Sequence, residues 1–299
     1  MTFTLMIRRD VLRLASGAVL ALTSCRSSQI KRVVVGSKNF TEQIILGELL
    51  AQQIEAHTGL RVERRLNLGG TFLCHQAMLA GQLDVYPEYT GTALTAILGQ
   101  QPSGNAAAVY QTVRENYRRR FDLEVGPALG FNNTFAIVVR GDDAARLHLR
   151  TISDLVAHAR HLRAGFGYEF MERPDGYSGL ARAYGLAFAS EPRIMDLGLL
   201  YRALEEKQVD VVAGNSTDGL IATLGMVVLE DDRGYFPPYQ AVVIVRGAAL
   251  REYPELRSVL DALGGKIAED EMRRMNYEVD SQRREASDVV RALRNAHAL

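Results

Sequence analysis

The chain has 299 residues, 47% of them apolar and 23% charged, so it can form one large or two medium-sized α/β domains with a packed core. Its 35 basic residues balance 35 acidic residues, which argues against a surface dedicated to nucleic acid and favours small molecules or proteins as partners. Two cysteines are too few for a disulfide framework or a thiolate zinc site, and the absence of Trp leaves aromatic recognition to Tyr and Phe.

Residues 1–24 predict an export signal. Basic residues precede an apolar run, 14–22, that is too short to span a bilayer. Leu-Thr-Ser-Cys at its end resembles a lipobox, so we expect Cys25 to carry a lipid anchor and residues 25–31 to form a tether. An ordinary cleaved signal with an incidental cysteine is the alternative. Paired arginines also resemble a twin-arginine signal, so export of the folded or of the unfolded chain remains open.

The first part of the exported chain alternates short apolar runs with helical patterns. The β-branched run 32–36 predicts a strand, and apolar residues at helical spacing predict a helix from 41 or 42 to about 57. Further strands are expected at 60–66 and 83–86, with a helix from 71 to about 80 between them. This order, with short turns, is typical of a parallel sheet covered by helices.

The middle of the chain repeats this alternation, and its end is helical. The patterns predict strands at 135–140, 163–167, 209–213 and 241–246, helices at 152–159 and 179–184, and a helical segment from 253 onward. The strand sequences FAIVVR and AVVIVR read as two copies that bracket an inserted segment. We therefore expect one lobe of residues 32–134 and 241–299, a second of residues 135–240, and two crossover strands between them.

Sequence signatures of catalysis are missing. The chain contains no Gly-x-Ser-x-Gly elbow, no His-Glu-x-x-His and no phosphate-binding Gly-x-x-x-x-Gly-Lys. Its six histidines are scattered, and the pair His158 and His161 fits a solvated helix end better than a metal site. Cys74 fits a buried structural thiol. No catalytic residue, metal or cofactor is predicted.

Small polar residues and aromatic residues recur together where strands end or helices begin. Ligands of open α/β sheets bind at that edge. Helix N–H groups with Ser, Thr and Gln side chains suit a carboxylate, and Tyr and Phe faces attract a cation. A zwitterion with a methylated ammonium group would satisfy both. The segments that show this pattern are GSKNFTEQ (36–43), DVYPEYTGT (84–92), GFNNTF (130–135), RPDGY (173–177), NSTDG (215–219) and GYFPPY (234–239).

In this order the segments resemble the osmoprotectant substrate-binding proteins of ATP-binding-cassette (ABC) importers, which bind glycine betaine, carnitine or choline. The resemblance implies an α/β, two-lobed periplasmic binding protein of type II with two crossover hinge strands, no catalysis, and delivery of a quaternary ammonium solute to a membrane permease. By motif, Tyr89 and Tyr239 match rings of an aromatic cage, and Gln43 and Thr92 match its polar end. Lys38 is a further candidate for holding the anionic group.

Two positions depart from the pattern of this family. Phe135 stands where relatives commonly have Tyr, and Asn215 stands where they commonly have another Tyr. One missing ring corresponds to about 0.5 to 2 kcal/mol, or about 2- to 30-fold in affinity. We expect either weak binding of glycine betaine, carnitine and choline, or a more polar ligand such as a larger betaine with hydrogen-bonding groups.

The sequence thus predicts a monomeric, lipid-anchored solute-binding protein at the periplasm or cell surface. Two other functions stay open. One is an exported enzyme acting on small amino or betaine compounds, although no nucleophile with a base within reach is evident in the sequence. The other is a ligand sensor without a role in transport.

Overall fold

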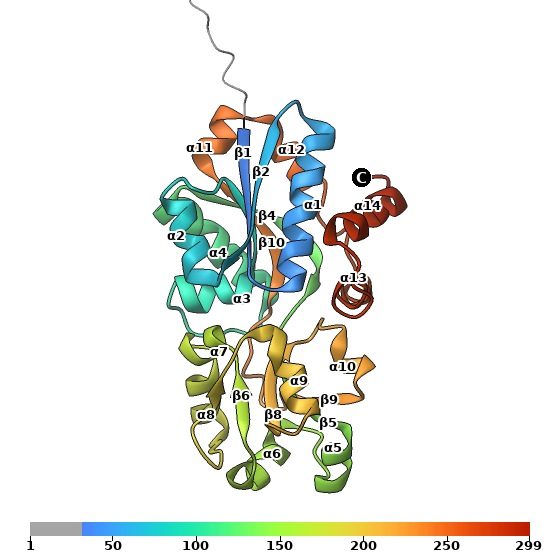
Figure 1. Ribbon diagram of the computed structural model, residues 1–299. Coiled ribbons are helices and arrows are strands. Elements are labelled where there is room, and N and C mark those ends of the chain that lie inside the picture. The colour runs from blue at the N-terminus through green and yellow to red at the C-terminus, as the bar shows by residue number, and fades with distance from the viewer. Residues whose placement is uncertain (1–31) are drawn as a thin grey trace, which may run out of the picture. The chain divides into compact units, whose positions relative to one another are not determined.

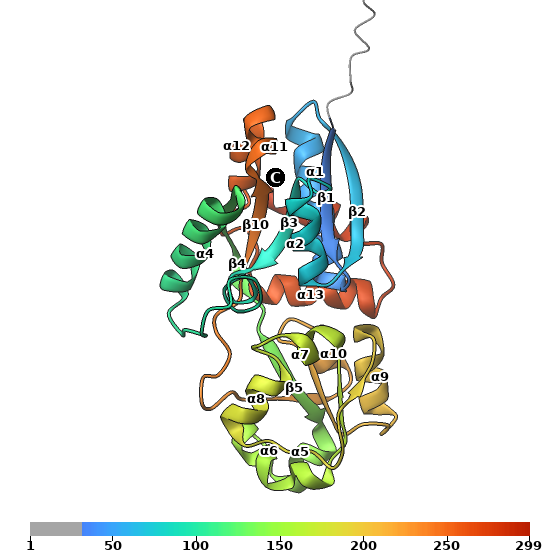
Figure 2. The ribbon, with the colours of Figure 1, turned by 90° about the vertical axis from the view of Figure 1, so that its left-hand side faces the viewer.

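The computed structural model describes residues 32–299, which are built on two separate five-stranded sheets (Figures 1 and 2). The expected signal sequence, the tether and Cys25 lie outside the described residues. None of the helices in the described part combines the length and apolar character needed to cross a membrane.

The first sheet defines the part of the protein that we call lobe 1. Its strands are β1 (Arg32–Lys38), β2 (Arg61–Gly69), β3 (Val85–Tyr89), β4 (Leu123–Asn132) and β10 (Gln240–Arg246). They lie in the order β2-β1-β3-β10-β4, in which β1 is parallel to β2 and β3 while β10 is antiparallel to β3 and β4. The parallel sheet predicted for the start of the chain is therefore part of a mixed sheet, because a strand from far along the chain enters it.

Helices cover both faces of this sheet. They are α1 (Thr41–His57), α2 (Thr71–Leu79), α3 (Thr90–Thr92), η1 (Ala93–Ile97), α4 (Ala106–Phe121), α11 (Gly247–Glu252), α12 (Glu255–Asp261), α13 (Glu269–Asp280) and α14 (Ala286–His297). Val33 and Val35 of β1 pack into the core beside α1, whereas Val34 packs into a second core beneath α2 and α4. A strand that is buried on both faces needs such a continuous apolar run.

The second sheet defines lobe 2. Its strands are β5 (Phe135–Arg140), β6 (Ala164–Phe166), β7 (Arg193–Ile194), β8 (Val211–Asn215) and β9 (Met226–Leu229), in the order β7-β6-β8-β5-β9. Its helices are α5 (Gly141–Leu147), α6 (Ile152–His158), η2 (Ala159–His161), α7 (Tyr168–Glu172), α8 (Tyr177–Tyr184), η3 (Leu197–Leu199), α9 (Leu200–Glu205) and α10 (Leu220–Thr223). Apolar residues of β5 and β8 alternate between cores on the two faces.

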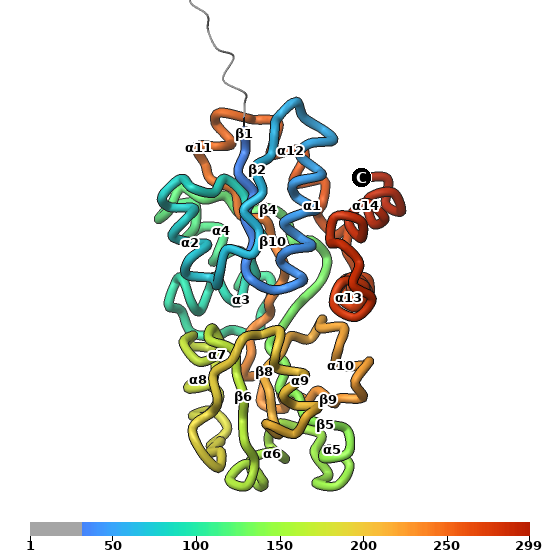
Figure 3. The backbone as a smooth tube through the Cα atoms, in the orientation of Figure 1, coloured from blue at the N-terminus to red at the C-terminus, as the bar shows by residue number. Residues whose placement is uncertain are grey.

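The chain passes between the two sheets twice, which can be followed in Figure 3. It leaves lobe 1 after β4 through Asn133 and Thr134, and it returns from β9 to β10 through residues 230–239. The strands and helices expected from the sequence are confirmed, with ends shifted by a few residues. Several elements had no predicted counterpart, among them α4, β4 and β9.

Candidate functional site

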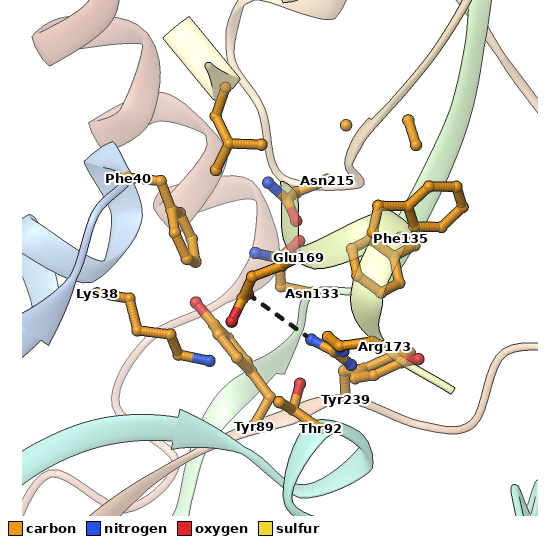
Figure 4. A pocket seen from close by; sticks show the side chains of 14 residues that line it. Lys38, Phe40, Tyr89, Thr92, Asn133, Phe135, Glu169, Arg173, Asn215 and Tyr239 are labelled. Carbon is orange, nitrogen blue, oxygen red and sulfur yellow. Dashed lines mark ion pairs between the residues drawn. The ribbon is translucent and has the colours of Figure 1, made fainter. Parts of the chain in front are cut away.

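A narrow cavity of about 40 Å³ lies between the lobes and is lined by both (Figure 4). Six of the seven ligand-binding residues predicted from the sequence line it: Lys38, Tyr89, Thr92, Phe135, Asn215 and Tyr239. The other lining residues are Phe40, Asn133, Glu169, Phe170, Arg173, Leu197, Ala213 and Gly214. The pocket thus brings together residues from distant segments of the chain. It agrees with the general observation that ligands of open α/β sheets bind at the edge where strands end.

Two parallel strands deliver the side chains of lobe 1. β1 ends at Lys38 and β3 ends at Tyr89, so both side chains project from the carboxyl edge of the sheet. The Lys38 side chain is buried; its ammonium lies 5.0 Å from the centroid of the Tyr89 ring and donates to Thr71 Oγ1 at 3.0 Å. It also forms a 2.5 Å ion pair with Glu88, a residue that does not line the cavity, so the Glu88 carboxylate neutralises the positive charge of Lys38.

Gln43 is the one predicted ligand-binding residue that does not line the cavity. It is fully buried on α1, and its Oε1 accepts a hydrogen bond from the backbone N–H of Lys38 at 3.3 Å. Its Nε2 has no hydrogen-bond partner within residues 32–299. In this structure Gln43 contacts the site through Lys38.

The rings of Phe135 and Tyr239 form the opposite wall. Their centroids are 5.9 Å apart and their planes meet at 72°. The Arg173 guanidinium lies 4.7 Å from the centroid of Phe135 and 5.8 Å from that of Tyr239. Asp175 holds it with two hydrogen bonds of 2.9 and 2.6 Å, and the Tyr239 hydroxyl donates to the same carboxylate at 2.6 Å. The wall is therefore a fixed unit of two rings, one cation and one carboxylate.

Gly91 allows this wall to approach lobe 1. A Cβ atom at Gly91 would lie 2.6 Å from Cδ1 of Tyr239 and 2.8 Å from the carbonyl oxygen of Pro238. Both distances are shorter than van der Waals contact, and the backbone oxygen cannot easily move. Only glycine fits here, between Thr90, whose hydroxyl donates to Pro238 O, and the pocket-lining Thr92.

Glu169 brings a carboxylate from α7 of lobe 2 into the cavity. It accepts a hydrogen bond from the backbone N–H of Thr71, at the start of α2 in lobe 1, and lies 4.0 Å from Arg173. Burial alone would raise the pKa of Glu169, but the charges of Lys38 and Arg173 together with the hydrogen bonding of Thr71 outweigh burial and hold the pKa below its usual value. Because Lys38 and Arg173 each have another carboxylate partner, Glu169 is a negative charge in excess at this site.

Asn215 stands where the family pattern has a ring. It is the last residue of β8 and pairs directly with Phe135 on the neighbouring strand, so both side chains lie on the pocket side of the sheet. Its backbone N–H donates to Asp218 at 2.8 Å. Asn215 also lines a second cavity, of about 620 Å³. Asn215 thus borders both cavities with an amide where the family pattern has a ring.

Residues 31–295 match the family model described as the substrate-binding domain of the ABC-type glycine betaine transport system. The chain belongs to this family. It is thus a substrate-binding protein of an ABC transport system, and its two-lobed α/β fold agrees with that of solved family members.

Relatives within and near this family are similar over most of the chain. The carnitine transport binding protein OpuCC of Listeria monocytogenes is 37% identical over 91% of this chain and 90% of its own length. The ergothioneine transport permease and binding protein EgtU of Helicobacter pylori is 35% identical over 84% of this chain and 45% of its own. A crystal structure described as that of a glycine betaine/carnitine/choline ABC transporter is 34% identical to this chain. The match covers 89% of this chain and 98% of the other chain, with a TM-score of 0.72.

Eight lining residues were not predicted as ligand-binding, among them Phe40, Asn133, Glu169 and Arg173. Phe40, Asn133 and Arg173 fall in the motifs GSKNFTEQ, GFNNTF and RPDGY that carry the family resemblance, so the motifs contained the signal. Glu169 lies just before the last of these, in a helix of five residues without a distinctive pattern. Only the tertiary structure brings it beside Lys38 and Arg173.

Cys74 and His75 lie outside the pocket and have structural surroundings. Burial raises the pKa of the Cys74 thiol to about 12, and burial lowers the pKa of His75 to about 4. His75 packs against the rings of Tyr117 and Phe121. Cys74 is thus a buried thiol, as the sequence predicted. Across residues 32–299 we find no cluster of His, Cys, Asp or Glu side chains that could hold a metal ion.

Proposed function

We propose that the pocket binds a betaine, a zwitterion with a quaternary ammonium group, and that the protein delivers it to an ABC permease. The observation that carries this proposal is the convergence of the rings of Tyr89, Phe135 and Tyr239 on one cavity that also holds polar and cationic groups. A methylated ammonium cannot donate hydrogen bonds, so aromatic faces are its natural partners, at about 0.5 to 2 kcal/mol per ring.

The remaining lining residues suit the anionic end of such a ligand. Thr92 and the buried Lys38 offer donors beside Tyr89, and Arg173 offers a guanidinium on the other wall. Charge-assisted hydrogen bonds to these groups are stronger than bonds between neutral partners. We infer that the carboxylate lies toward Lys38 and Thr92 and that the ammonium lies against the rings.

We further infer that the betaine carries an additional hydrogen-bonding group. Asn215 supplies an amide where a ring is missing, Asn133 has an Oδ1 without a partner in the described structure, and Glu169 is an acceptor in excess. The relative from Helicobacter pylori is named for ergothioneine, a betaine whose ring bears N–H donors. A ligand of this class would use these acceptors, whereas glycine betaine would leave them unused.

A ligand screen tests the proposal directly. Purified protein is titrated calorimetrically with glycine betaine, choline, carnitine and ergothioneine. We expect heat of binding from at least one of them, with ergothioneine the tightest. If none binds at millimolar concentration, the quaternary ammonium assignment is wrong, although the family membership stands.

Tyrosine substitutions locate the bound cation. Replacing Tyr89 or Tyr239 with Ala removes a ring from the pocket, whereas Tyr110→Ala removes a partly buried ring from α4, where its hydroxyl donates to Gly126 O. We expect the first two changes to weaken binding by about tenfold or more and the third to leave affinity unchanged. Equal losses from all three would show that the rings act only through stability.

We propose that the protein works outside the cytoplasmic membrane as a monomer anchored by a lipid on Cys25. The lipobox-like sequence before Cys25 supports the anchor. A Cys25→Ser variant, expressed in cells, should appear in the soluble extracytoplasmic fraction, while the parent protein should sediment with membranes. Membrane association of both would contradict the anchor.

Binding without chemistry is part of the proposal. Relatives such as the carnitine transport binding protein of Listeria monocytogenes are named as binding proteins. The pocket brings charged groups into tight pairs, and its lining residues include no nucleophile beside a base. A bound ligand should be recovered unchanged after prolonged incubation, as mass spectrometry can show. Turnover of the ligand would favour the alternative of an exported enzyme.

A further inference from the structure

Glu42, near the start of α1, is a buried carboxylate that accepts four hydrogen bonds. Its Oε1 accepts from the Tyr89 hydroxyl at 2.6 Å and from Asn133 Nδ2 at 2.8 Å. Its Oε2 accepts from the Thr217 hydroxyl at 2.5 Å and from Asn276 Nδ2 at 3.1 Å. Burial raises the pKa of Glu42, and these four donors counteract that effect. No Lys or Arg forms an ion pair with it within the described range 32–299, so the four neutral donors carry its stabilisation.

The partners of Glu42 come from both lobes. Tyr89 ends β3 and Asn276 lies on α13, both in lobe 1, whereas Thr217 follows β8 in lobe 2 and Asn133 lies on the connection between the lobes. Figures 1 and 2 show α13 at the end of lobe 1 that faces lobe 2. One carboxylate oxygen of Glu42 therefore accepts from the Tyr89 hydroxyl, and the other accepts from Thr217 of lobe 2.

The loop of lobe 2 that carries Thr217 docks closely on α13. Asn276 Nδ2 also donates to the Thr217 carbonyl oxygen at 2.9 Å, and both residues are almost fully buried. A Cβ atom on Gly219 would lie 2.5 Å from the backbone nitrogen of Tyr277. The absence of a side chain at Gly219 thus permits the contact, and the contact excludes water around the Glu42 carboxylate.

We propose that Glu42 is a positioning residue that couples the orientation of the Tyr89 ring to the docking of loop 215–219 of lobe 2 on α13. The inference rests on the proposed function in one respect, because it takes Tyr89 to be a ring that contacts the ligand. When the loop is docked, Glu42 fixes the Tyr89 hydroxyl and holds the ring in the pocket. When the loop separates from α13, Oε2 loses the Thr217 donor and the carboxylate is free to turn away from Tyr89.

Hydrogen exchange without any ligand tests the coupling. Tyr89→Phe keeps the ring and removes only the hydroxyl that donates to Glu42, and Thr217→Val removes the donor of lobe 2 with little change in volume. We expect both variants to increase the exchange rate of backbone amides in residues 211–220 by about fivefold or more, measured by mass spectrometry. Thr217→Ser keeps the hydroxyl and should restore slow exchange.

Tyr110→Phe is the matched control for Tyr89→Phe. The Tyr110 hydroxyl donates to Gly126 O within lobe 1 and contacts neither Glu42 nor loop 215–219, so its loss should leave exchange in 211–220 within about twofold of the parent. Glu42→Gln should act like the two test variants, because an amide cannot accept four hydrogen bonds. Circular dichroism of each variant verifies that it is folded.

The Tyr89→Phe variant gives the decisive result. The substitution is in lobe 1, whereas the amide exchange is measured in residues 211–220 of lobe 2. Unchanged exchange in 211–220 for a folded Tyr89→Phe protein would overturn the coupling. So would additive effects of Tyr89→Phe and Thr217→Val in the double variant, because two donors that act through one carboxylate should not act independently. Neither result depends on which ligand binds, so failure of the coupling is distinguishable from failure of the proposed function.

Discussion

Restoring a ring at Asn215 tests how the pocket selects its ligand. Asn215 pairs with Phe135 across strands β8 and β5, so a Tyr at this position would stand beside Phe135 on the pocket side of the sheet. The larger cavity of about 620 Å³ that Asn215 also lines provides room for the added atoms. The substitution Asn215→Tyr should therefore add a wall to the pocket without displacing its neighbours.

The expected change in ligand affinity follows from the contacts that Asn215→Tyr adds and removes. The side-chain contact of Asn215 with Asp218 is long, at 3.5 Å, and the stronger 2.8 Å hydrogen bond from the backbone N–H is kept by any residue. The new ring contributes about 0.5 to 2 kcal/mol toward a quaternary ammonium, or about 2- to 30-fold in affinity. Glycine betaine and choline should therefore bind more tightly to the variant. Ergothioneine should bind less tightly if its polar ring uses the Asn215 amide.

Calorimetric titration of the parent, Asn215→Tyr and Asn215→Leu with glycine betaine, choline and ergothioneine separates the possible causes. Leu fills similar space without a ring quadrupole, so it serves as the control for burial alone. A gain with Leu as large as that with Tyr would refute the cation–π argument. A loss of glycine betaine affinity with Tyr would refute the placement of the ammonium group against the ring of Phe135, which pairs with Asn215.

Three further predictions concern charge and close packing. Burial raises the pKa of the partly buried Asp218 to about 6 from an ordinary 3.8, so its contribution to stability is complete below about pH 3.8 and is lost as the pH rises past 6. The control is Asp218→Asn, which keeps an acceptor for the Tyr201 hydroxyl. In urea titrations, the unfolding free energy of the parent should fall by about 2 kcal/mol relative to this variant between about pH 4 and 7. Parallel pH profiles of the two proteins would contradict this. Glu169→Gln removes the carboxylate in excess and should shift the ratio of glycine betaine to choline affinities about fivefold toward glycine betaine in calorimetry, whereas an unchanged ratio would show that Glu169 does not sense ligand charge. Gly91→Ala should lower stability by about 1 to 3 kcal/mol and reduce affinity for the best ligand of the screen, because its Cβ meets Tyr239 and Pro238; affinity equal to that of the parent would refute the close-packing argument.

The sequence predicted the elements of the fold better than their pairing. Buried strands such as 32–36 and 135–140 carry a strong local signal, because their apolar runs are short and rich in β-branched residues. The direction and partners of β10 do not, because an antiparallel strand that joins β3 and β4 from more than a hundred residues away leaves no local trace. Helix α4 and the following strand β4 were not predicted from the sequence.

The site shows the same division between local and tertiary information. Tyr89 and Tyr239 belong to motifs with aromatic residues at strand ends, and the structure places both in one pocket with Asn215. Gln43 belongs to a motif too, but the sequence cannot show that Lys38 lies between it and the cavity. Glu169 could not be predicted, because its importance arises from the α2 N-terminus and from two cations that approach it only in the folded protein.

The position of β10 in its sheet has a consequence for the order of folding. The strands of lobe 2 all lie within residues 135–229 and can pair as soon as that segment is available, whereas the sheet of lobe 1 stays divided between β3 and β4 until residues 240–246 arrive. Contacts that span a long stretch of chain form late. Tyr239 directly precedes β10, so the same late step that joins the sheet also places the last ring in the pocket. Ligand binding should therefore appear only after β10 has joined its sheet.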